Sequence, residues 1–79
     1  MKTVTVYTQP DCPPCKIVKQ FLQHYDIPFA EYDIKKDSAA RDRLVYDYHS
    51  YSTPTVVIDG EVVTGFNIEK LQQLLGLEA

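Results

Sequence analysis

The chain has 79 residues, a formal net charge of −3 and 44% hydrophobic residues. This length predicts one domain (1–79), near the small end of what folds without disulfides or metals. The acidic balance argues against a nucleic-acid or anionic-membrane surface, and no segment reaches the ~20 apolar residues of a membrane span. A strand pattern starts at once and leaves no room for a signal peptide, so we expect a cytoplasmic protein in a thiol-reducing setting.

The first two elements are predicted to be a strand and a helix. Residues 2–8 alternate, with Val4 and Val6 on one face, and their β-branched content favours a central strand. Residues 12–25 then read as a helix, whose two initial prolines are tolerated because first-turn N–H groups have no helical partner. We expect its apolar residues to form one buried stripe: Ile17, Val18, Phe21, Leu22 and Tyr25.

The middle of the chain predicts a second strand and a second helix. Residues 29–34 form the strand, and a strand, helix and strand in this spacing imply a parallel pair with a right-handed crossover. Ser38 is the expected N-cap of a helix over residues 39–48. The residues expected to face inward from it are Ala40, Leu44, Val45 and Tyr48.

The last third predicts a hairpin and a third helix. Residues 55–58 and 61–64 are β-rich runs separated by Asp59-Gly60, which is a strong hairpin signal. Asn67 can cap a helix over Ile68–Leu75, which Gly76 would end. The order β-α-β-α-β-β-α therefore predicts an α/β fold: a four-stranded mixed sheet with helices on both faces.

Cys12-Pro13-Pro14-Cys15 contains the only two cysteines of the chain, between the first predicted strand and its following helix. Open α/β sheets place their sites at such carboxyl ends of strands. A helix N-terminus lowers the pKa of a thiol through unpaired N–H groups and the helix dipole. A thiolate there can attack a disulfide, and a second thiol three residues later can resolve the mixed disulfide. The motif predicts a dithiol redox protein.

Other interpretations of the cysteine pair stay open. Zinc normally takes four ligands, and His24 would lie about 13.5 Å from Cys15 along a continuous helix, too far to share a metal; we therefore expect no metal site and no tightly bound cofactor. A structural disulfide over so short a loop would be a poor staple. An iron–sulfur or metal carrier in which two chains pool cysteines is one alternative function, and a non-enzymatic interaction module with vestigial thiols is another.

The motif, the later Thr53-Pro54, the hairpin, and Gly65-Phe66-Asn67 before the last helix together resemble the glutaredoxins of the thioredoxin superfamily. The resemblance spans nearly the whole chain and implies a thioredoxin-like fold. Thr64-Gly65-Phe66 looks more like the NrdH-type redoxins, glutaredoxin-shaped electron donors often reduced by thioredoxin reductase.

This resemblance implies roles for individual residues. Cys12 would be the attacking thiolate, Cys15 the resolving thiol, and Pro54 a cis-proline facing the pair, since X-Pro is the only bond with a low-cost cis form. Thr53 would offer its backbone to an extended substrate. The implied partners are disulfide-containing proteins and either a thioredoxin-reductase-type enzyme or glutathione, with the chain as a monomer. The expected substrate contacts are Gln9, Pro14, Thr53, Pro54, Gly65, Phe66 and Asn67.

Several residues differ from those common in the glutathione-using members of the family, and these differences favour reduction by a thioredoxin-reductase-type enzyme. Those proteins commonly carry a Lys before the motif, an aromatic residue inside it and Gly-Gly-x-Asp-Asp before the last helix. Here the positions read Gln9, Pro14 and Thr64-Gly65-Phe66-Asn67-Ile68. Two carboxylates and one cation for glutathione are therefore missing, and we expect weak glutathione-dependent activity.

Several residues near these motifs allow two interpretations. Lys16 and Lys19 either add a positive field at Cys12 or are solvated surface lysines. Tyr51 lies either along the substrate groove or on the surface. His49 replaces the glycine that usually ends the second helix of the family, and we interpret it as a C-cap because His tolerates positive φ.

Overall fold

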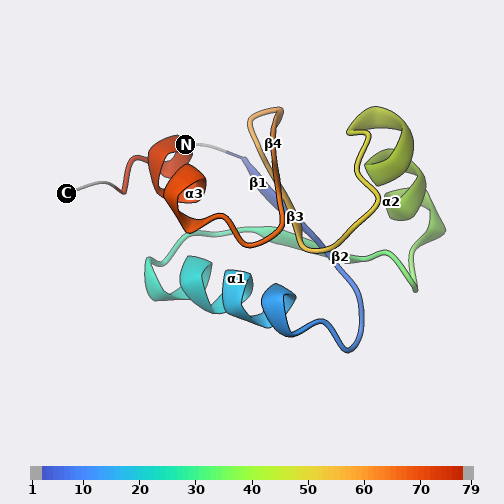
Figure 1. The fold of residues 1–79 in the computed structure, drawn as a ribbon, viewed down its shortest axis with the longest axis horizontal. Coiled ribbons are helices and arrows are strands. Elements are labelled where there is room, and N and C mark those ends of the chain that lie inside the picture. The colour runs from blue at the N-terminus through green and yellow to red at the C-terminus, as the bar shows by residue number, and fades with distance from the viewer. Residues whose placement is uncertain (1–2, 78–79) are drawn as a thin grey trace.

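The computed structural model describes residues 3–77, so Lys2, which the sequence placed in the first strand, lies outside the described residues. The observed order of elements follows the predicted order, with one addition, a π-helical turn after the second helix (Figure 1). The strands are β1 (Val4–Thr8), β2 (Ala30–Asp33), β3 (Thr55–Ile58) and β4 (Glu61–Thr64). The helical segments are α1 (Pro13–His24), α2 (Ser38–Asp42), the π-helical turn η1 (Arg43–Asp47) and α3 (Ile68–Leu75).

The sheet is mixed and four-stranded, with strand order β2-β1-β3-β4. β1 runs parallel to β2 and antiparallel to β3, which confirms the predicted parallel pair and the central place of the first strand. β3 and β4 pair antiparallel around Asp59 and Gly60, which have φ angles of 48° and 87°. A tight hairpin turn needs positive φ at these two positions, and Asp-Gly supplies it at low steric cost.

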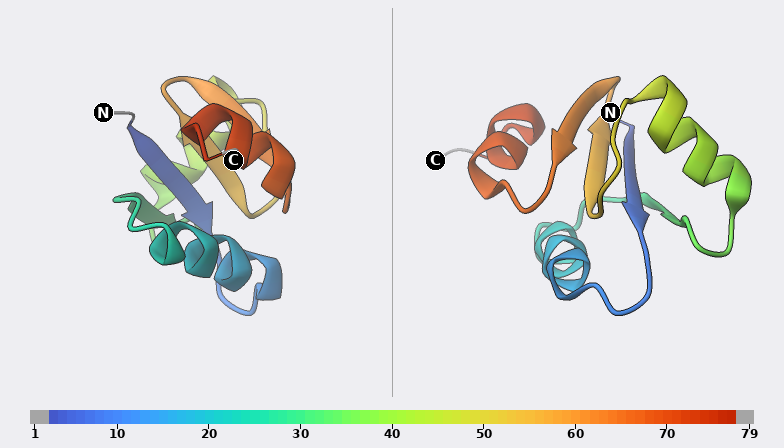
Figure 2. Two further views of the ribbon diagram at one scale, coloured as in Figure 1. Left: turned by 90° about the vertical axis from the view of Figure 1, so that its left-hand side faces the viewer. Right: turned by 45° about the vertical axis from the view of Figure 1, so that its right-hand side comes forward.

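Helices cover both faces of the sheet, as predicted (Figure 2). On one face, Val4 and Val6 of β1 pack with Val18 and Leu22 of α1 and with Leu71 of α3. On the other face, Tyr7 of β1 packs with α2 and η1 through Ala40 and Leu44. Since both sides of β1 are buried, its carboxyl end is held firmly where the cysteine motif begins.

Helix α1 buries a narrower stripe than the sequence predicted. It begins at Pro13, with Cys12 as N-cap, and ends at His24. Val18 and Leu22 are fully buried, but Ile17 and Tyr25 are 48% and 42% exposed, so the prediction that they are buried was wrong. The small sheet accepts mainly one i, i+4 row of a twelve-residue helix, and residues at the margins of the stripe stay accessible.

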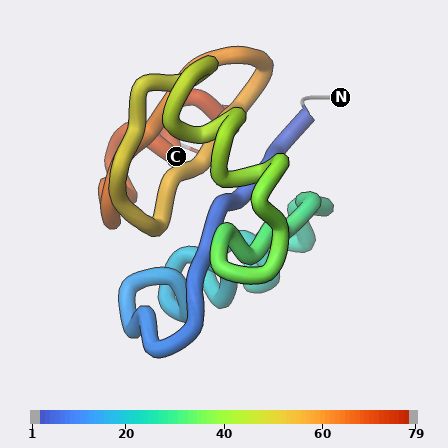
Figure 3. Tube along the Cα trace, turned by 90° about the vertical axis from the view of Figure 1, so that its right-hand side faces the viewer, coloured from blue at the N-terminus to red at the C-terminus, as the bar shows by residue number. Residues whose placement is uncertain are grey.

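The second helical segment differs from the prediction in its cap and its winding. Asp37, not Ser38, is the N-cap: its Oδ1 accepts a hydrogen bond from the Ala40 N–H at 3.1 Å. A carboxylate there is also favoured by the helix dipole. From Arg43 the coil widens into η1, closed by the Tyr48 N–H donating to the carbonyl five residues back at 3.2 Å. In Figure 3 this coil lies nearest the viewer.

Other predictions for this region were confirmed in part. Ala40 and Leu44 are buried, and Tyr48 packs against them while partly exposed, as does Tyr32 of β2. Val45 is only half-buried. His49, directly after the Tyr48 C-cap of η1, has a φ of 53°, the left-handed conformation expected of a residue that ends a helix.

Helix α3 has the caps that the sequence predicted. The Asn67 side chain accepts a hydrogen bond from the Lys70 N–H at 3.2 Å. Gly76 ends the helix in the left-handed conformation, with a φ of 70°. Leu71 is fully buried against the sheet and fixes α3 beside α1.

Candidate active site

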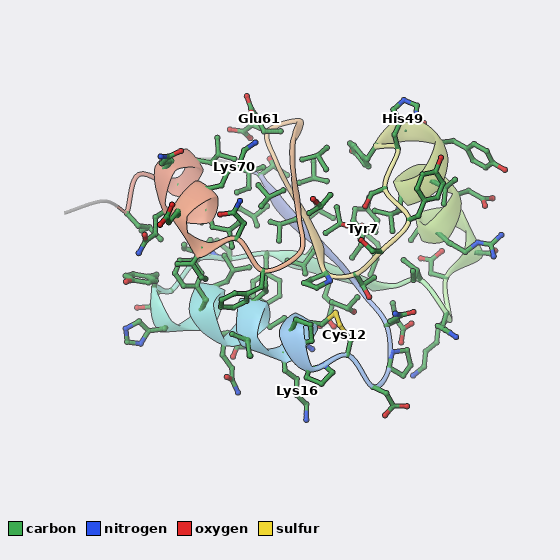
Figure 4. All side chains as sticks on the ribbon, in the orientation of Figure 1. Tyr7, Cys12, Lys16, His49, Glu61 and Lys70 are labelled. Atoms are coloured by element: carbon green, nitrogen blue, oxygen red, sulfur yellow. A yellow bond between two sulfur atoms is a disulfide. The ribbon has the colours of Figure 1, made fainter. Side chains whose placement is uncertain are left out.

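The two cysteines form a disulfide at the N-terminus of α1 (Figure 4). Asp11, with a φ of 57°, turns the chain from the end of β1 into the helix. The Cys15 N–H donates to Cys12 Sγ at 3.2 Å, so Cys12 caps the helix with its sulfur. Cys15 is 2% exposed, whereas Cys12 is partly exposed. An incoming group therefore has access to Cys12 and not to Cys15.

The electrostatics at Cys12 depend on few donors. Pro13 and Pro14 occupy the first two helical positions, are exposed and have no N–H to offer. The Cys15 N–H and the positive end of the α1 dipole remain, and both favour a thiolate after reduction. Lys16 is exposed, and in Figure 4 its side chain points away from the disulfide into solvent.

The segment before β3 lies against Cys12. The Thr53–Pro54 bond is cis, as the family resemblance implied. Pro54 is buried, and Thr53 Oγ1 is 3.7 Å from Cys12 Sγ, within the range of a hydrogen bond to sulfur. The Gly65 N–H donates to the Pro54 carbonyl at 2.8 Å. Thr53 thus lies against the exposed sulfur, and the adjacent Pro54 is bonded to Gly65; we call this neutral region of three residues the Pro54 side of the site.

A buried polar network shapes the Pro54 side from within. Thr55 Oγ1 donates to the Ser52 carbonyl at 2.7 Å and lies 2.8 Å from Ser50 Oγ. Both Ser50 and Thr55 are buried. The sequence did not reveal this network, although three hydroxyl residues around a Thr-Pro are a recognisable signal for turns closed by side chains.

The remaining predicted contact residues lie at different places. Phe66 is 47% exposed and lines a shallow groove with residues of α1 and α3. Asn67 follows it but uses its side-chain oxygen to cap α3. Gln9 lines a cavity beside Cys12 that Thr53 does not line. Tyr51 is 78% exposed.

That cavity, of about 670 Å³, opens beside both cysteines and is lined by ionisable side chains. We call it the charged cavity. Its charged residues come from the loop before α1, from α1, from β2 and from the turn after β2: Asp11, Lys16, Lys19, Glu31, Asp33 and Lys36.

Glu31 is the centre of the hydrogen bonding in the charged cavity. One carboxylate oxygen, Oε2, accepts from Lys19 Nζ at 3.0 Å and from Thr8 Oγ1 at 2.9 Å. Partial burial alone would raise the pKa of Glu31, but these two donors together hold it below its usual value. The Glu31 carboxylate is therefore ionised and fixed in place near neutral pH. The sequence analysis singled out neither Glu31 nor Thr8.

The described chain carries no other obvious centre. Among residues 3–77, histidine, cysteine, aspartate and glutamate side chains form no group of three or more that could hold a metal ion. Within the same residues, no helix combines the length and the apolar content needed to cross a membrane.

An exposed sulfur at a helix N-terminus, joined to a shielded sulfur one turn later, is suited to thiol–disulfide exchange, and the sheet that presents it is the thioredoxin-like α/β fold. The class is thus that of a CxxC thiol–disulfide oxidoreductase. Comparison with known families agrees, because the model described as Glutaredoxin matches residues 4–63. The chain belongs to the glutaredoxin family.

Individual relatives have the same size and fold. An uncharacterised glutaredoxin-like 8.6 kDa protein from the rubredoxin operon of Clostridium pasteurianum is 28% identical over 72 residues, covering 91% of this chain and 96% of that protein. The glutaredoxin-like protein NrdH of Lactococcus lactis is 28% identical over 71 residues, covering 90% and 97%. The crystal structure of the T8A mutant of the thioredoxin-like protein BC3987 is 70% identical, with a TM-score of 0.94 over 99% of this chain and 100% of that one.

Proposed function

We propose that this protein is an NrdH-type electron donor, which reduces disulfides in proteins and is itself reduced by a thioredoxin-reductase-type enzyme in preference to glutathione. The observation that carries the proposal is the neutral chemistry of the Pro54 side, where Thr53 contacts the accessible sulfur. Thr53 contacts Cys12, Gly65 is bonded to the adjacent Pro54, and none of the three carries a charge for a small charged peptide.

The proposed reaction moves two electrons. The Cys12 thiolate attacks a substrate disulfide, forming a Cys12–substrate bond and releasing one substrate sulfur as a thiolate, which takes up a proton. Cys15 then loses its proton and attacks Cys12 Sγ, which releases the second substrate thiol. The protein leaves with the Cys12–Cys15 disulfide, and the reductase returns two electrons and two protons to it.

We propose that an extended substrate segment binds along the Pro54 side. Thr53 would present its backbone N–H and C=O for a short β-type pairing, which holds a scissile disulfide near Cys12 without reading side chains. Exposed Phe66 would add apolar contact, and Pro14 and Asn67 would flank it. Gln9 would approach the substrate from the charged-cavity side of Cys12.

Glutathione would gain little binding free energy from the Pro54 side. It carries two carboxylates and one amino group, and a charge-assisted hydrogen bond to each contributes about 1.5–3 kcal/mol. Losing two or three such bonds weakens recognition by orders of magnitude, because about 1.4 kcal/mol corresponds to a factor of ten. The Asn67 side chain does not substitute for a carboxylate, since its oxygen caps α3.

The proposed function also implies a cellular location and an oligomeric state. A dithiol donor must be kept reduced, so we propose that it works in the cytoplasm, where thiols stay reduced. Both cysteines of the reaction come from one chain, so a monomer suffices. Size-exclusion chromatography with light scattering would check the monomer directly.

The test is which system reduces the oxidised protein. We expect rapid turnover of a protein disulfide with NADPH and a thioredoxin reductase, and slow turnover with glutathione and glutathione reductase. A saturable, micromolar response to glutathione or to a glutathionylated substrate would refute the preference. A protein that is coloured as purified would instead support the iron–sulfur carrier, and absence of any disulfide reduction would support the interaction module.

A further inference from the structure

The charged cavity contains an ion pair that the proposed exchange steps do not use. Among residues 3–77, Lys19 and Glu31 form the cavity's salt bridge, with Nζ and Oε2 3.0 Å apart. The side chains are 29% and 39% exposed, so the pair is only partly screened by water. It shares the cavity with both cysteines, and the residues of the Pro54 side do not line that cavity.

Lys19 is close to Cys15 by the geometry of the helix. The two residues are four apart on α1, which places them as neighbours on one helix face, and both line the charged cavity. Glu31 faces them from β2, and the Thr8 hydroxyl at the end of β1 holds the same carboxylate oxygen at 2.9 Å. The carboxylate is therefore anchored from two elements.

The other charges of the cavity do not replace this pair. Asp33 uses its Oδ1 to accept from the Lys35 N–H at 2.8 Å, closing its own turn. Among residues 3–77, the exposed side chains of Asp11, Lys16 and Lys36 form no salt bridge, so they are not held in place as the pair is. With three cations and three carboxylates, the cavity is formally neutral, and loss of Glu31 would leave one positive charge in excess.

We infer that Glu31 is a positioning residue of the redox site: it pairs with Lys19 beside Cys15, offsets that positive charge at the sulfurs, and so makes the reduced dithiol a stronger electron donor. The inference rests on the proposed function and explains how this chain would be set to give electrons.

The sign follows from the charge of the thiolate. Reduction of the disulfide adds two electrons and two protons, and a cation near a sulfur favours the thiolate over the thiol. Stabilising the thiolate stabilises the reduced form, which makes a dithiol protein a better oxidant and a poorer donor. A carboxylate paired with the cation has the opposite effect. Glu31 thus disfavours the thiolate, whereas Lys19 and the helix dipole favour it.

The experiment compares Glu31→Gln, Lys19→Gln and the double variant. Glutamine keeps an oxygen that can accept from Thr8 and Lys19, so Glu31→Gln removes the charge with little change in shape. Glu61→Gln is the matched control, since Glu61 is an exposed carboxylate of β4 at the hairpin turn, far from Cys12 in Figure 4. The readouts are the thiol–disulfide equilibrium constant against dithiothreitol, the pH dependence of thiolate absorbance, and thermal melting.

We expect Glu31→Gln to shift the equilibrium toward the dithiol by roughly threefold to tenfold and to lower the thiol pKa by about half a unit to one unit, the effect of one nearby, partly screened charge. Lys19→Gln should shift both in the opposite direction, the double variant should lie near the wild type, and Glu61→Gln should change neither. An unchanged equilibrium for Glu31→Gln, a shift in the direction of Lys19→Gln, or a lowered melting temperature as the sole effect would overturn the inference.

These readouts involve neither a protein substrate nor a reductase. Poor turnover with thioredoxin reductase alongside the expected equilibrium shifts would overturn the proposed function and leave the role of Glu31 standing. Normal turnover with an unaltered equilibrium in Glu31→Gln would do the reverse.

Discussion

Two regions of opposite chemistry meet at the disulfide: the neutral Pro54 side and the charged cavity. Cys12 is accessible and meets the Pro54 side, where its partner is the Thr53 hydroxyl at 3.7 Å. Cys15 is 2% exposed, and both cysteines line the charged cavity. Groups that can hold a substrate and groups that can set thiol energetics therefore belong to two different regions around the disulfide. Substitutions on one side should change binding or accessibility, and those on the other should change the redox equilibrium.

The largest effects are expected from removing each sulfur in turn, which tests whether the two cysteines have different roles. Cys12→Ser should abolish disulfide exchange, a loss of at least about a thousandfold, because no accessible nucleophile remains. Cys15→Ser should still form a mixed disulfide with a substrate but fail to release it. Mass spectrometry of the trapped complexes measures both outcomes.

Alkylation of the reduced protein gives the control for that assignment. Iodoacetamide below neutral pH should label Cys12 first, because it is the more exposed sulfur. Preferential labelling of Cys15 would reverse the roles of attacker and resolver.

A smaller effect, on the free energy of unfolding, is expected from removing the side-chain cap of α3. Asn67→Ala removes the side-chain oxygen that accepts from the Lys70 N–H at 3.2 Å. We expect a loss of about 1 kcal/mol in the free energy of unfolding, the typical cost of an N-cap, without a change in the thiol–disulfide equilibrium. Asn67→Asp, which keeps the cap, serves as the control in urea titrations. A changed thiol–disulfide equilibrium in Asn67→Ala would show that the cap of α3 is coupled to the redox centre.

Thr53→Val isolates the hydroxyl that approaches Cys12. The hydrogen bond to sulfur is long, so removing it should raise the pKa of the Cys12 thiol slightly and slow its alkylation below neutral pH by about two- to threefold. Exposed Thr64 on β4 offers the control variant Thr64→Val. Acceleration of alkylation in Thr53→Val would contradict a stabilising contact.

The smallest expected effect is the stability that the protein loses in acid when Glu31 of the charged cavity is protonated. The folded-state pKa of Glu31 lies below its usual value, so its contribution to stability is present above the unfolded pKa and is lost as pH falls through the folded one. Because the side chain is 39% exposed, the loss between about pH 5 and pH 3 should stay below about 1 kcal/mol. Urea unfolding of the wild type and Glu31→Gln at both pH values measures it; an equal loss in both would show that Glu31 contributes nothing.

The sequence predicted elements whose determinants are local. Asp59-Gly60 needs only its own φ angles to close the hairpin, and Asn67 caps α3 from within one turn. The choice of Asp37 over Ser38 as cap was missed because either side chain can accept the same kind of bond. The winding of η1 was missed because its residues also fit an α-helical stripe.

Long-range features needed the folded chain. The contact between Thr8 and Glu31 depends on the register of two strands, in which Thr8 pairs with Asp33 and Val6 with Glu31, and a one-residue slip would turn Glu31 to the opposite face. The closeness of Thr53 to Cys12 was expected only from the family resemblance, since no local pattern joins residues so distant in sequence.

Strand β2 has one further consequence, for how molecules of this protein behave at high concentration. It is an outer strand of an open sheet, so the side away from β1 offers unpaired backbone groups to another chain. β2 has only four residues, and two of them, Glu31 and Asp33, are carboxylates. Short length and charge are both devices that keep such an edge from pairing with a neighbour. The carboxylate that faces the redox centre therefore also discourages edge-to-edge aggregation.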